Sequence, residues 1–274
     1  MSVYVGTRDV VTVAGEEATK YLQGQISQDV LGLAVGESAW SLILQPQGKV
    51  DAWFRITKTA DDAYALDVDA GHGETLLARL KRFKLRTKAD LELVTWDWHA
   101  WRAAAPDIVA PDGAIVAPPP GGQSGVDVIG PHLDAPEGDE LSANDLDRLR
   151  IEAFVPAMGA ELTEDTIPAE AGIVDASVSF TKGCYTGQEL VARVDSRGNN
   201  TPRRLRLVTG AGLPSASSAL MLDGADVGVL TSVASSGDGF VALAYVKRSA
   251  SEATELELDG ATVTVAAPPA EGNS

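Results

Sequence analysis

The sequence contains very little cysteine and histidine. One cysteine, Cys184, and three histidines, His72, His99 and His132, occur in 274 residues. A single cysteine cannot form a disulfide within the chain, so a disulfide-stapled scaffold is excluded. Four-cysteine cluster cages and ordinary zinc sites need more thiol and imidazole ligands than this chain has. We therefore expect no resident metal.

Basic residues are scarce relative to acidic ones, with 22 Lys and Arg against 39 Asp and Glu and a formal net charge of −17. This charge argues against general nucleic-acid binding and against anionic membranes, because both need a basic surface. Residues 1–13 lack a basic segment followed by an apolar stretch, and no apolar run approaches bilayer length. We expect a monomeric cytoplasmic protein without direct nucleic-acid or membrane partners, and one cysteine is compatible with a reducing compartment.

Aromatic residues are also few, at 5% of the chain, although 45% of residues are hydrophobic. Aliphatic side chains must therefore supply most of the core, and this apolar fraction argues against a disordered chain. The length suits one large domain or two to three small ones.

Apolar spacing predicts a mixture of helices and strands up to residue 200. We expect helices at residues 15–26, 74–84 and 142–154, and strands at 38–44, 50–57, 63–68, 91–96, 99–104, 114–117 and 126–129. Ser142 and Asp145 are expected to cap the start of the third helix. After Pro202 the pattern changes to short alternating strands, predicted at 205–209, 220–222, 227–234, 240–246, 256–258 and 262–266. Asp223-Gly224 and Asp259-Gly260 each lie between apolar runs and predict tight hairpins. The fold class is α+β for residues 1–200, a small antiparallel barrel or sandwich over 201–268, and a frayed tail over 269–274.

The run Lys182-Gly183-Cys184-Tyr185-Thr186-Gly187-Gln188-Glu189 holds the only cysteine. Thr186 and Glu189 have the spacing of a capping box, which predicts a helix beginning near Gly187. A thiol near a helix start, two residues after a lysine, favours the thiolate form. The alternative is a small buried hydrophobic residue, which is the commonest role of a lone cysteine.

The same run resembles the signature of the YgfZ-type folate-binding proteins, which are relatives of the glycine cleavage T-protein, an aminomethyltransferase. The signature is long and hard to meet by chance. Further stretches agree with this family, at residues 21–25, 28–30, 149–153, 167–171, 227–232 and 241–246. The resemblance spans nearly the whole chain, apart from the loop near 106–140 and the last few residues.

This resemblance implies a three-lobed cloverleaf around a central hole. Two interleaved mixed α/β lobes would take residues 1–45 with 140–200 and residues 46–139, and the C-terminal barrel would close the ring. It also implies tetrahydrofolate, or a one-carbon derivative, in the hole. The function implied is support of iron–sulfur cluster assembly or repair, with an indirect effect on tRNA modification and with assembly or client proteins as partners.

The resemblance also suggests site residues. Glu152 matches the T-protein glutamate that binds the pterin ring, and a carboxylate suits the adjacent N–H donors of that ring. The alternative is a solvated helix carboxylate paired with Arg148 or Arg150. Asp51 lies where the T-protein has an acidic pair, one member of which is credited with activating folate N5, but Ala52 replaces the second acid.

Cys184 has no counterpart in T-protein catalysis. It would act as a nucleophile or soft metal ligand, with Lys182 tuning its charge. Tyr185 and Gln188 are candidates for contacting the ligand, although a tyrosine in such a position is more often packing. Two other functions stay open: a folate-dependent aminomethyltransferase-like enzyme acting through Asp51, and a scaffold that has lost folate and binds only partners.

Overall fold

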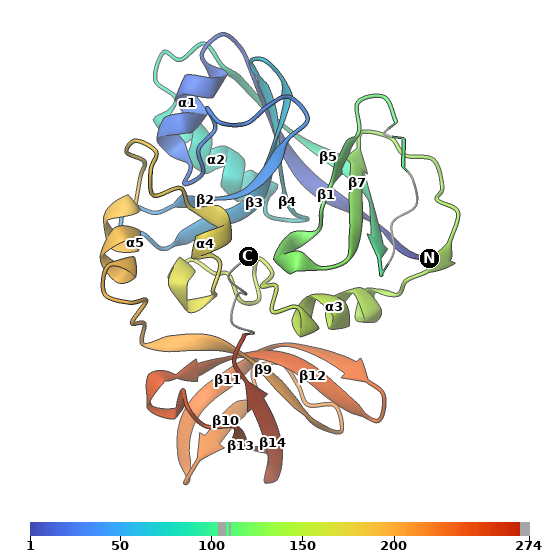
Figure 1. Cartoon of the computed structure of the whole chain (residues 1–274), viewed down its shortest axis with the longest axis vertical. Helices are drawn as coiled ribbons and strands as arrows, with labels where there is room; N and C mark the ends of the chain where they lie inside the picture. Colours follow the sequence, from blue (N-terminus) through green and yellow to red (C-terminus); the bar gives the residue numbers. More distant parts are fainter. Residues whose placement is uncertain (104–107, 110, 269–274) are drawn as a thin grey trace.

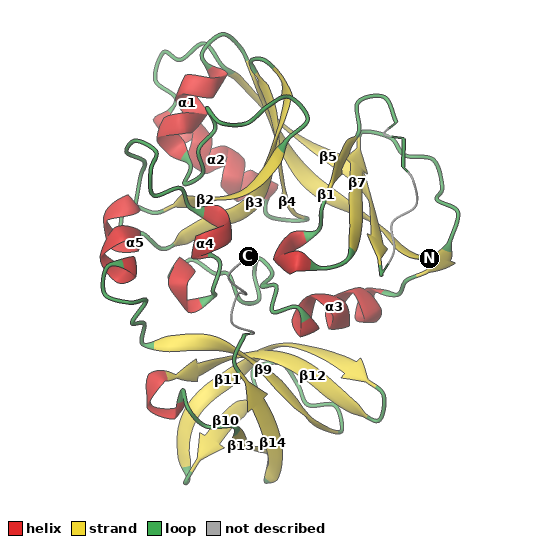
Figure 2. Ribbon diagram, in the orientation of Figure 1, coloured by secondary structure: helices red, strands yellow, loops and turns green. Residues whose placement is uncertain are grey.

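The computed structural model describes residues 1–103, 108–109 and 111–268. A large curled sheet with helices forms the upper part of the molecule in Figure 1, and a separate barrel lies below it. The helices flank the sheet and the connection to the barrel (Figure 2). The predicted strand end at Ala104 and the predicted frayed tail at 269–274 lie outside the described residues.

The sheet contains strands from the first half of the chain. They are β1 Ser2–Ala14, β2 Ser38–Leu44, β3 Val50–Ala60, β4 Ala63–Asp69, β5 Asp90–Arg102, β6 Ile115–Ala117, β7 Gly125–Gly130 and β8 Asp139–Glu140. Their order is β2-β3-β4-β1-β5-β7-β6, and β8 pairs with β1 in parallel. Strand β1, which the sequence analysis missed, is therefore the centre of the sheet.

The prediction of two strands at 91–96 and 99–104 was wrong, because β5 is one continuous strand. It pairs antiparallel with β1 along its whole length, from Ala14 opposite Asp90 to Ser2 opposite Arg102. Backbone pairing with β1 continues through polar residues such as Asp97, so these residues do not end the strand.

Helices pack on both faces of the sheet and against the barrel. They are α1 Ala18–Gln25, α2 Gly73–Phe83, α3 Ala143–Glu152, α4 Val174–Ser177 and α5 Gln188–Asp195. Leu22 of α1 and Leu80 of α2 are fully buried against Phe54 of β3 in one aliphatic core. The cap predicted for α3 is confirmed, since the Ser142 side chain accepts a hydrogen bond from the Asp145 N–H. Among the described residues, no helix is both long and apolar enough to cross a bilayer.

The C-terminal strands close into a barrel, as predicted. They are β9 Arg203–Ala211, β10 Ala219–Leu222, β11 Ala225–Ser236, β12 Gly239–Lys247, β13 Glu255–Leu258 and β14 Ala261–Ala266, in the order β10-β11-β12-β9-β14-β13. Asp223 and Gly224 have φ of 51° and 77°, and Asp259 and Gly260 have 51° and 82°, the left-handed pairs that two-residue hairpins need. The α+β fold class with a C-terminal barrel is confirmed, and the lobe boundaries stay predictions. The boundary at 45/46 falls in the turn between β2 and β3 of one sheet.

The start of α5 differs from the predicted capping box. The residue before the helix is Gly187, with φ of 83°, and it has no side-chain cap. Gly187 lies against the β2–β3 turn, where a Cβ on Gly187 would be 2.6 Å from the Gln45 carbonyl oxygen and 3.2 Å from the Gly48 Cα. The two glycines thus allow the Cys184 segment to pack on the hairpin, which is a packing reason for the Gly in the signature.

Replacing Gly187 by Ala should lower the free energy of unfolding by about 2 kcal/mol or more, because the left-handed backbone is strained and the Cβ meets backbone atoms. Gly183→Ala is the matched control, since its Cβ would meet nothing within 4 Å. Urea denaturation followed by circular dichroism measures both. Equal stability of the two variants would contradict this packing.

Candidate functional site

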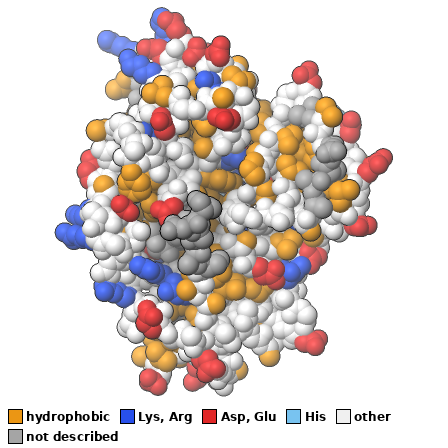
Figure 3. Space-filling model, viewed as in Figure 1, with side chains coloured by type: hydrophobic (Ala, Val, Ile, Leu, Met, Phe, Trp, Pro, Cys, Tyr) orange, Lys and Arg blue, Asp and Glu red, His pale blue; other side chains and the backbone are white. Residues whose placement is uncertain are grey.

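A cavity of about 250 Å³ lies between the sheet and the segment that includes and follows α3. In Figure 3, hydrophobic side chains gather in the hollow at the middle of the molecule. We call this space the central cavity. Its lining includes Arg8, Trp40, Trp53, Asp69, Trp98, Arg102, Gln123, Asp127, Asp147, Arg150 and Met158. These residues come from β1 to β5, β7 and α3 and from two loops, so the cavity exists only when the whole sheet is assembled.

Tryptophans form much of its wall, and hydrogen bonds hold two of the three indoles. Trp40 and Trp53 stack with ring centroids 4.3 Å apart. The Trp53 indole N–H donates to Ser177 Oγ at 2.9 Å, and the Trp98 indole N–H donates to Asp127 at 3.1 Å. Fixed indoles offer flat apolar surfaces to a ligand without losing side-chain freedom on binding.

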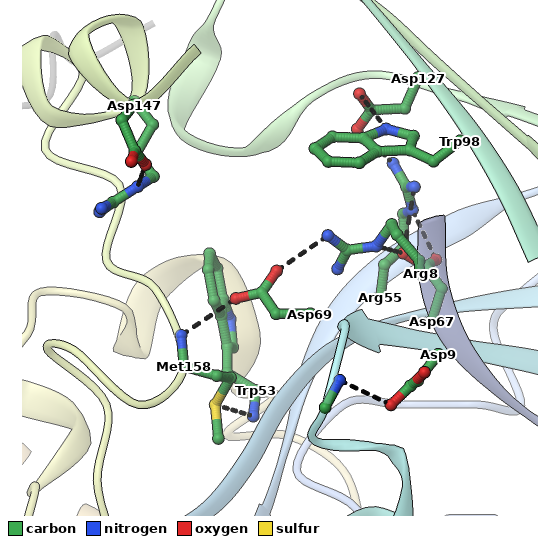
Figure 4. A network of polar contacts seen from close by, with 12 residues as sticks. Arg8, Asp9, Trp53, Arg55, Asp67, Asp69, Trp98, Asp127, Asp147 and Met158 are labelled. Carbon is green, nitrogen blue, oxygen red and sulfur yellow. Dashed lines mark hydrogen bonds and ion pairs between the residues drawn. The ribbon is translucent and has the colours of Figure 1, made fainter. Parts of the chain in front are cut away.

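Beneath the tryptophans lies a network of buried ion pairs, which we call the buried charge network (Figure 4). Asp67, fully buried on β4, accepts from Arg8 Nε at 2.7 Å and from Arg55 Nε at 2.9 Å. Arg55 continues to Asp127 at 3.1 Å, and Asp127 accepts from Arg102 at 3.0 Å. Buried charges are tolerated when they are paired and hydrogen-bonded in this way.

The pKa values reflect this pairing. Burial acts to raise the pKa of Asp127, but Arg55, Arg102 and Arg8 outweigh it and the pKa is lowered. Burial acts to lower the pKa of Arg8, and the charges of Asp67 and Asp69 more than offset it. Arg8 also reaches Asp69 at the edge of the cavity, at 2.8 Å, and lies 5.3 Å from the Trp98 ring centroid. These contacts orient the cavity wall.

Two polar atoms of the cavity have no hydrogen-bond partner among the described residues. They are Arg102 Nε, on a nearly buried side chain, and Gln123 Oε1. An unpaired buried polar atom costs on the order of 1–3 kcal/mol, so a ligand that pairs with it gains that energy. Arg102 and Gln123 both line the cavity, and a ligand reaches these two shielded atoms only when the side chains turn toward it.

Glu152, predicted from the resemblance, lies at the end of α3 with both carboxylate oxygens 3.1 Å from Arg148 Nη1. It lines a separate shallow hollow against β9 and β12 and is absent from the lining of the central cavity. The structure therefore shows the pairing with Arg148 that the sequence analysis kept as its alternative, and a role in ligand binding stays a prediction.

Asp51 is also outside the lining of the cavity. Its carboxylate forms an ion pair with Arg79 Nε at 2.7 Å, and Arg79 donates to the Leu44 carbonyl at 2.7 Å. Its role as a base stays a prediction.

The structure brings three of the predicted signature residues together. The Lys182 ammonium donates to the carbonyls of Ile26 at 2.7 Å and Gln28 at 2.6 Å, and it lies 5.4 Å from the Tyr185 ring centroid. The Tyr185 N–H donates to Gln188 Oε1 at 3.2 Å. Burial lowers the pKa of Lys182 to about 8, against the raising effect of Asp29, and burial raises the pKa of Tyr185 to about 12.

Cys184 is exposed, so the alternative of a buried small hydrophobic residue is wrong. Lys182, Tyr185 and Gln188 line a hollow of about 310 Å³ beside it, here called the signature hollow. Since the Lys182 ammonium is bonded to two carbonyls, its clearest role is to anchor the segment. Within the part of the chain that the structure describes, no three His, Cys, Asp or Glu side chains cluster as metal ligands.

Sequence reasoning named none of the residues that line the central cavity, and three of its candidates line the signature hollow. A signal for the cavity was present, because Arg8, Arg55 and Asp67 interrupt apolar strands and Trp98 lies in a strand rich in tryptophan. A charge inside a buried strand needs a partner across the sheet, and partners cannot be assigned before strand order is known.

The Lys182 amine should become reactive near pH 8, since its neutral form predominates above its lowered pKa. We expect its acetylation rate, followed by peptide mass spectrometry, to reach half its plateau at about that pH. Asp29→Asn should move this midpoint lower, because Asp29 raises the pKa, while the exposed Asp175→Asn should leave it in place. A midpoint above pH 10 in the wild type would contradict the buried position of the amine.

Three comparisons relate the chain to known proteins. No family model matches it. It is 30% identical over 209 residues to a Pyricularia oryzae protein named mitochondrial iron-sulfur cluster assembly factor IBA57 homolog, covering 70% of this chain and 53% of that one. It is 28% identical over 233 residues to the tRNA-modifying protein YgfZ of Vibrio atlanticus, covering 77% and 70%. The match thus spans about half the length of the fungal relative.

A search of solved structures found the glycine cleavage system aminomethyltransferase T of Bartonella henselae, with a TM-score of 0.78 and 18% identity. The match covers 98% of this chain and 85% of that one, which establishes the same fold. The sequence relatives and the shared fold both agree with the resemblance carried by the run around Cys184. The chain is a YgfZ-type protein, related in sequence to the YgfZ and IBA57 proteins and in fold to the glycine cleavage aminomethyltransferase.

Proposed function

We propose that the protein binds a tetrahydrofolate in its central cavity and supports the assembly or repair of iron–sulfur clusters. Its relatives include one named as an iron–sulfur cluster assembly factor and one named as tRNA-modifying. An effect on tRNA modification follows indirectly if the enzymes that modify tRNA depend on such clusters. The partners are then iron–sulfur assembly or client proteins, and the cytoplasm is the proposed compartment.

The observation that carries the proposal is the pair of unpartnered atoms in an aromatic cavity. A pterin is a flat ring whose edge alternates donors and acceptors, so it can accept from Arg102 Nε and donate to Gln123 Oε1. Trp53 and Trp98 supply apolar faces for the ring. Bound tetrahydrofolate would supply a reduced pterin able to carry a one-carbon group.

Other residues of the chain keep the cavity ready. Asp127 holds the Trp98 indole and the Arg102 guanidinium together, and Asp69 joins Arg8 to the Met158 N–H, its oxygens lying 2.8 and 3.0 Å from the two nitrogens. These contacts fix both sides of the cavity before a ligand arrives, which lowers the ordering cost of binding. For Glu152 to contact the pterin, its ion pair with Arg148 has to open.

Cys184 is proposed as the group that acts on the partner. It is exposed next to the signature hollow, and a thiolate is a good nucleophile and a soft metal ligand. One thiolate cannot hold a cluster alone, so the other ligands must come from a partner protein or a small thiol. Lys182 anchors the segment through two backbone carbonyls, and Tyr185 packs beneath it.

The alternative, an aminomethyltransferase-like reaction through Asp51, has less support. The fold is shared with an aminomethyltransferase, but a fold does not determine a reaction. The Asp51 carboxylate is bound to Arg79 and does not line the central cavity. No contact of the described residues favours this activity over the first proposal.

Gln123→Ala should weaken the binding of 5-formyltetrahydrofolate by about tenfold, since one hydrogen bond to the ligand is lost. The free energy of unfolding should change little, because Oε1 has no partner within the described chain and the one bond lost, from Gln123 Nε2 to the Pro120 carbonyl at 3.1 Å, is local. Titration followed by tryptophan fluorescence measures the affinity. Gln47→Ala, in the exposed β2–β3 turn, is the matched control. If wild type and Gln123→Ala bind equally, or neither binds, the cavity does not hold folate as proposed.

Cys184→Ser should leave both the unfolding midpoint and the folate titration unchanged, because the thiol is exposed and outside the central cavity. In cells that lack their own relative of this protein, the variant should fail to restore the activity of an iron–sulfur enzyme. The exposed Thr181→Ala variant of the same segment should restore it. Full restoration by Cys184→Ser would remove the thiol from the proposal.

A further inference from the structure

A concave region of about 350 Å³ lies where the chain leaves α5 and enters the barrel, and four arginines line it. Arg197 lies in the connection after α5, Arg204 and Arg206 on β9, and Arg248 after β12. We call it the arginine cleft. Basic side chains gather at the lower left of Figure 3, over the connection between α5 and β9 in Figure 1. The cleft shares no lining residue with the central cavity.

The four guanidinium groups lack acidic partners. Among the described residues, none of Arg197, Arg204, Arg206 and Arg248 forms an ion pair, although the chain carries 39 acidic residues. One acid, Glu252, also lines the cleft, so its local charge is about three positive. A concentration of like charge is unfavourable unless an anion compensates it.

Two of these side chains are held in place by backbone carbonyls. Arg204 Nη2 donates to the Asn199 carbonyl at 2.7 Å, and Arg206 Nη1 donates to that of Leu205 at 3.0 Å. Arg206 is only 8% exposed. Burial lowers the pKa of Arg206, and the charge of Arg204 adds to this effect. The guanidinium groups are thus oriented before any ligand binds, which favours a compact anion.

Polar uncharged groups complete the wall. Asn200, Thr201 and Ser251 line the cleft beside the arginines. Arginine forks match the oxygens of a phosphate in pairs, and amide and hydroxyl groups donate single hydrogen bonds to the remaining oxygens. The lining therefore suits a tetrahedral oxyanion with several charges.

We propose that the arginine cleft binds a small phosphate-bearing ligand with two or more linked phosphates. The concave shape favours a compact group that enters it. The net charge of −17 disfavours a long nucleic acid, which would also lie on acidic surface. The free diphosphate and the diphosphate of a nucleotide share this chemistry, and their relative affinities distinguish the two sources.

The experiment is calorimetric titration of the full chain with pyrophosphate, ADP and inorganic phosphate. Arg204→Gln and Arg248→Gln, both at exposed side chains, should each weaken pyrophosphate binding by about ten- to a hundredfold. The pyrophosphate affinity of Arg204→Lys should lie between those of the wild type and Arg204→Gln, because lysine keeps the positive charge but lacks the paired N–H donors of a guanidinium. Arg193→Gln, exposed on α5 and outside the cleft, makes the same charge change and should bind like the wild type.

Three results would overturn the proposal: no pyrophosphate binding by the wild type at millimolar concentration, equal affinity in Arg193→Gln and Arg204→Gln, or a single-stranded oligonucleotide that binds more tightly than pyrophosphate and displaces it. Folate titration of the same arginine variants should be unchanged, so this result is independent of the proposed function.

Discussion

The account of this protein depends on the carboxylates of Asp67 and Asp127, which are buried among three arginines. Through them β1, β3, β4, β5 and β7 are joined by side chains as well as by backbone pairing. A buried acid without its arginines would be far less stable than the pair, so the strands cannot shift without breaking the network. The same arginines lie beside the indole rings, with Arg55 5.7 Å from the Trp40 ring centroid. The ion pairs of the buried charge network thus hold the tryptophan rings in place, and these rings shape the central cavity.

The signature segment and the central cavity are mechanically connected, although their residues line different hollows. Tyr185 and Val191 belong to the same hydrophobic cluster as Trp53. The Trp53 indole also donates to Ser177, whose carbonyl accepts from the Ser27 hydroxyl at 2.6 Å. A movement of the Cys184 segment therefore acts on one wall of the cavity through packed side chains. This gives a physical route by which a bound ligand and an exposed thiol can influence each other.

Much of the fold could be predicted from local signals. The Asp-Gly turns, the cap at Ser142 and the strand alternation of the barrel each depend on neighbouring residues, and the structure confirms them. Strand β1 was missed, since Arg8 and Asp9 within it read as polar until their partners are known, which are Asp67 on β4 for Arg8 and the start of α2 for Asp9. The start of α5 is set by Gly187 against Gly48, a contact between residues far apart in the chain, and no capping pattern could show it. The cavity residues were missed because they are also far apart in the chain. Arg102, Gln123 and Asp127 come together only when β5 and β7 pair.

The most direct test of the central claim is a crystal structure of the protein with 5-formyltetrahydrofolate. The account predicts the pterin ring between Trp53 and Trp98, with one of its edge atoms within hydrogen-bond distance of Arg102 Nε and another of Gln123 Oε1. A ring bound elsewhere, or a central cavity filled only by water at saturating ligand, would contradict it.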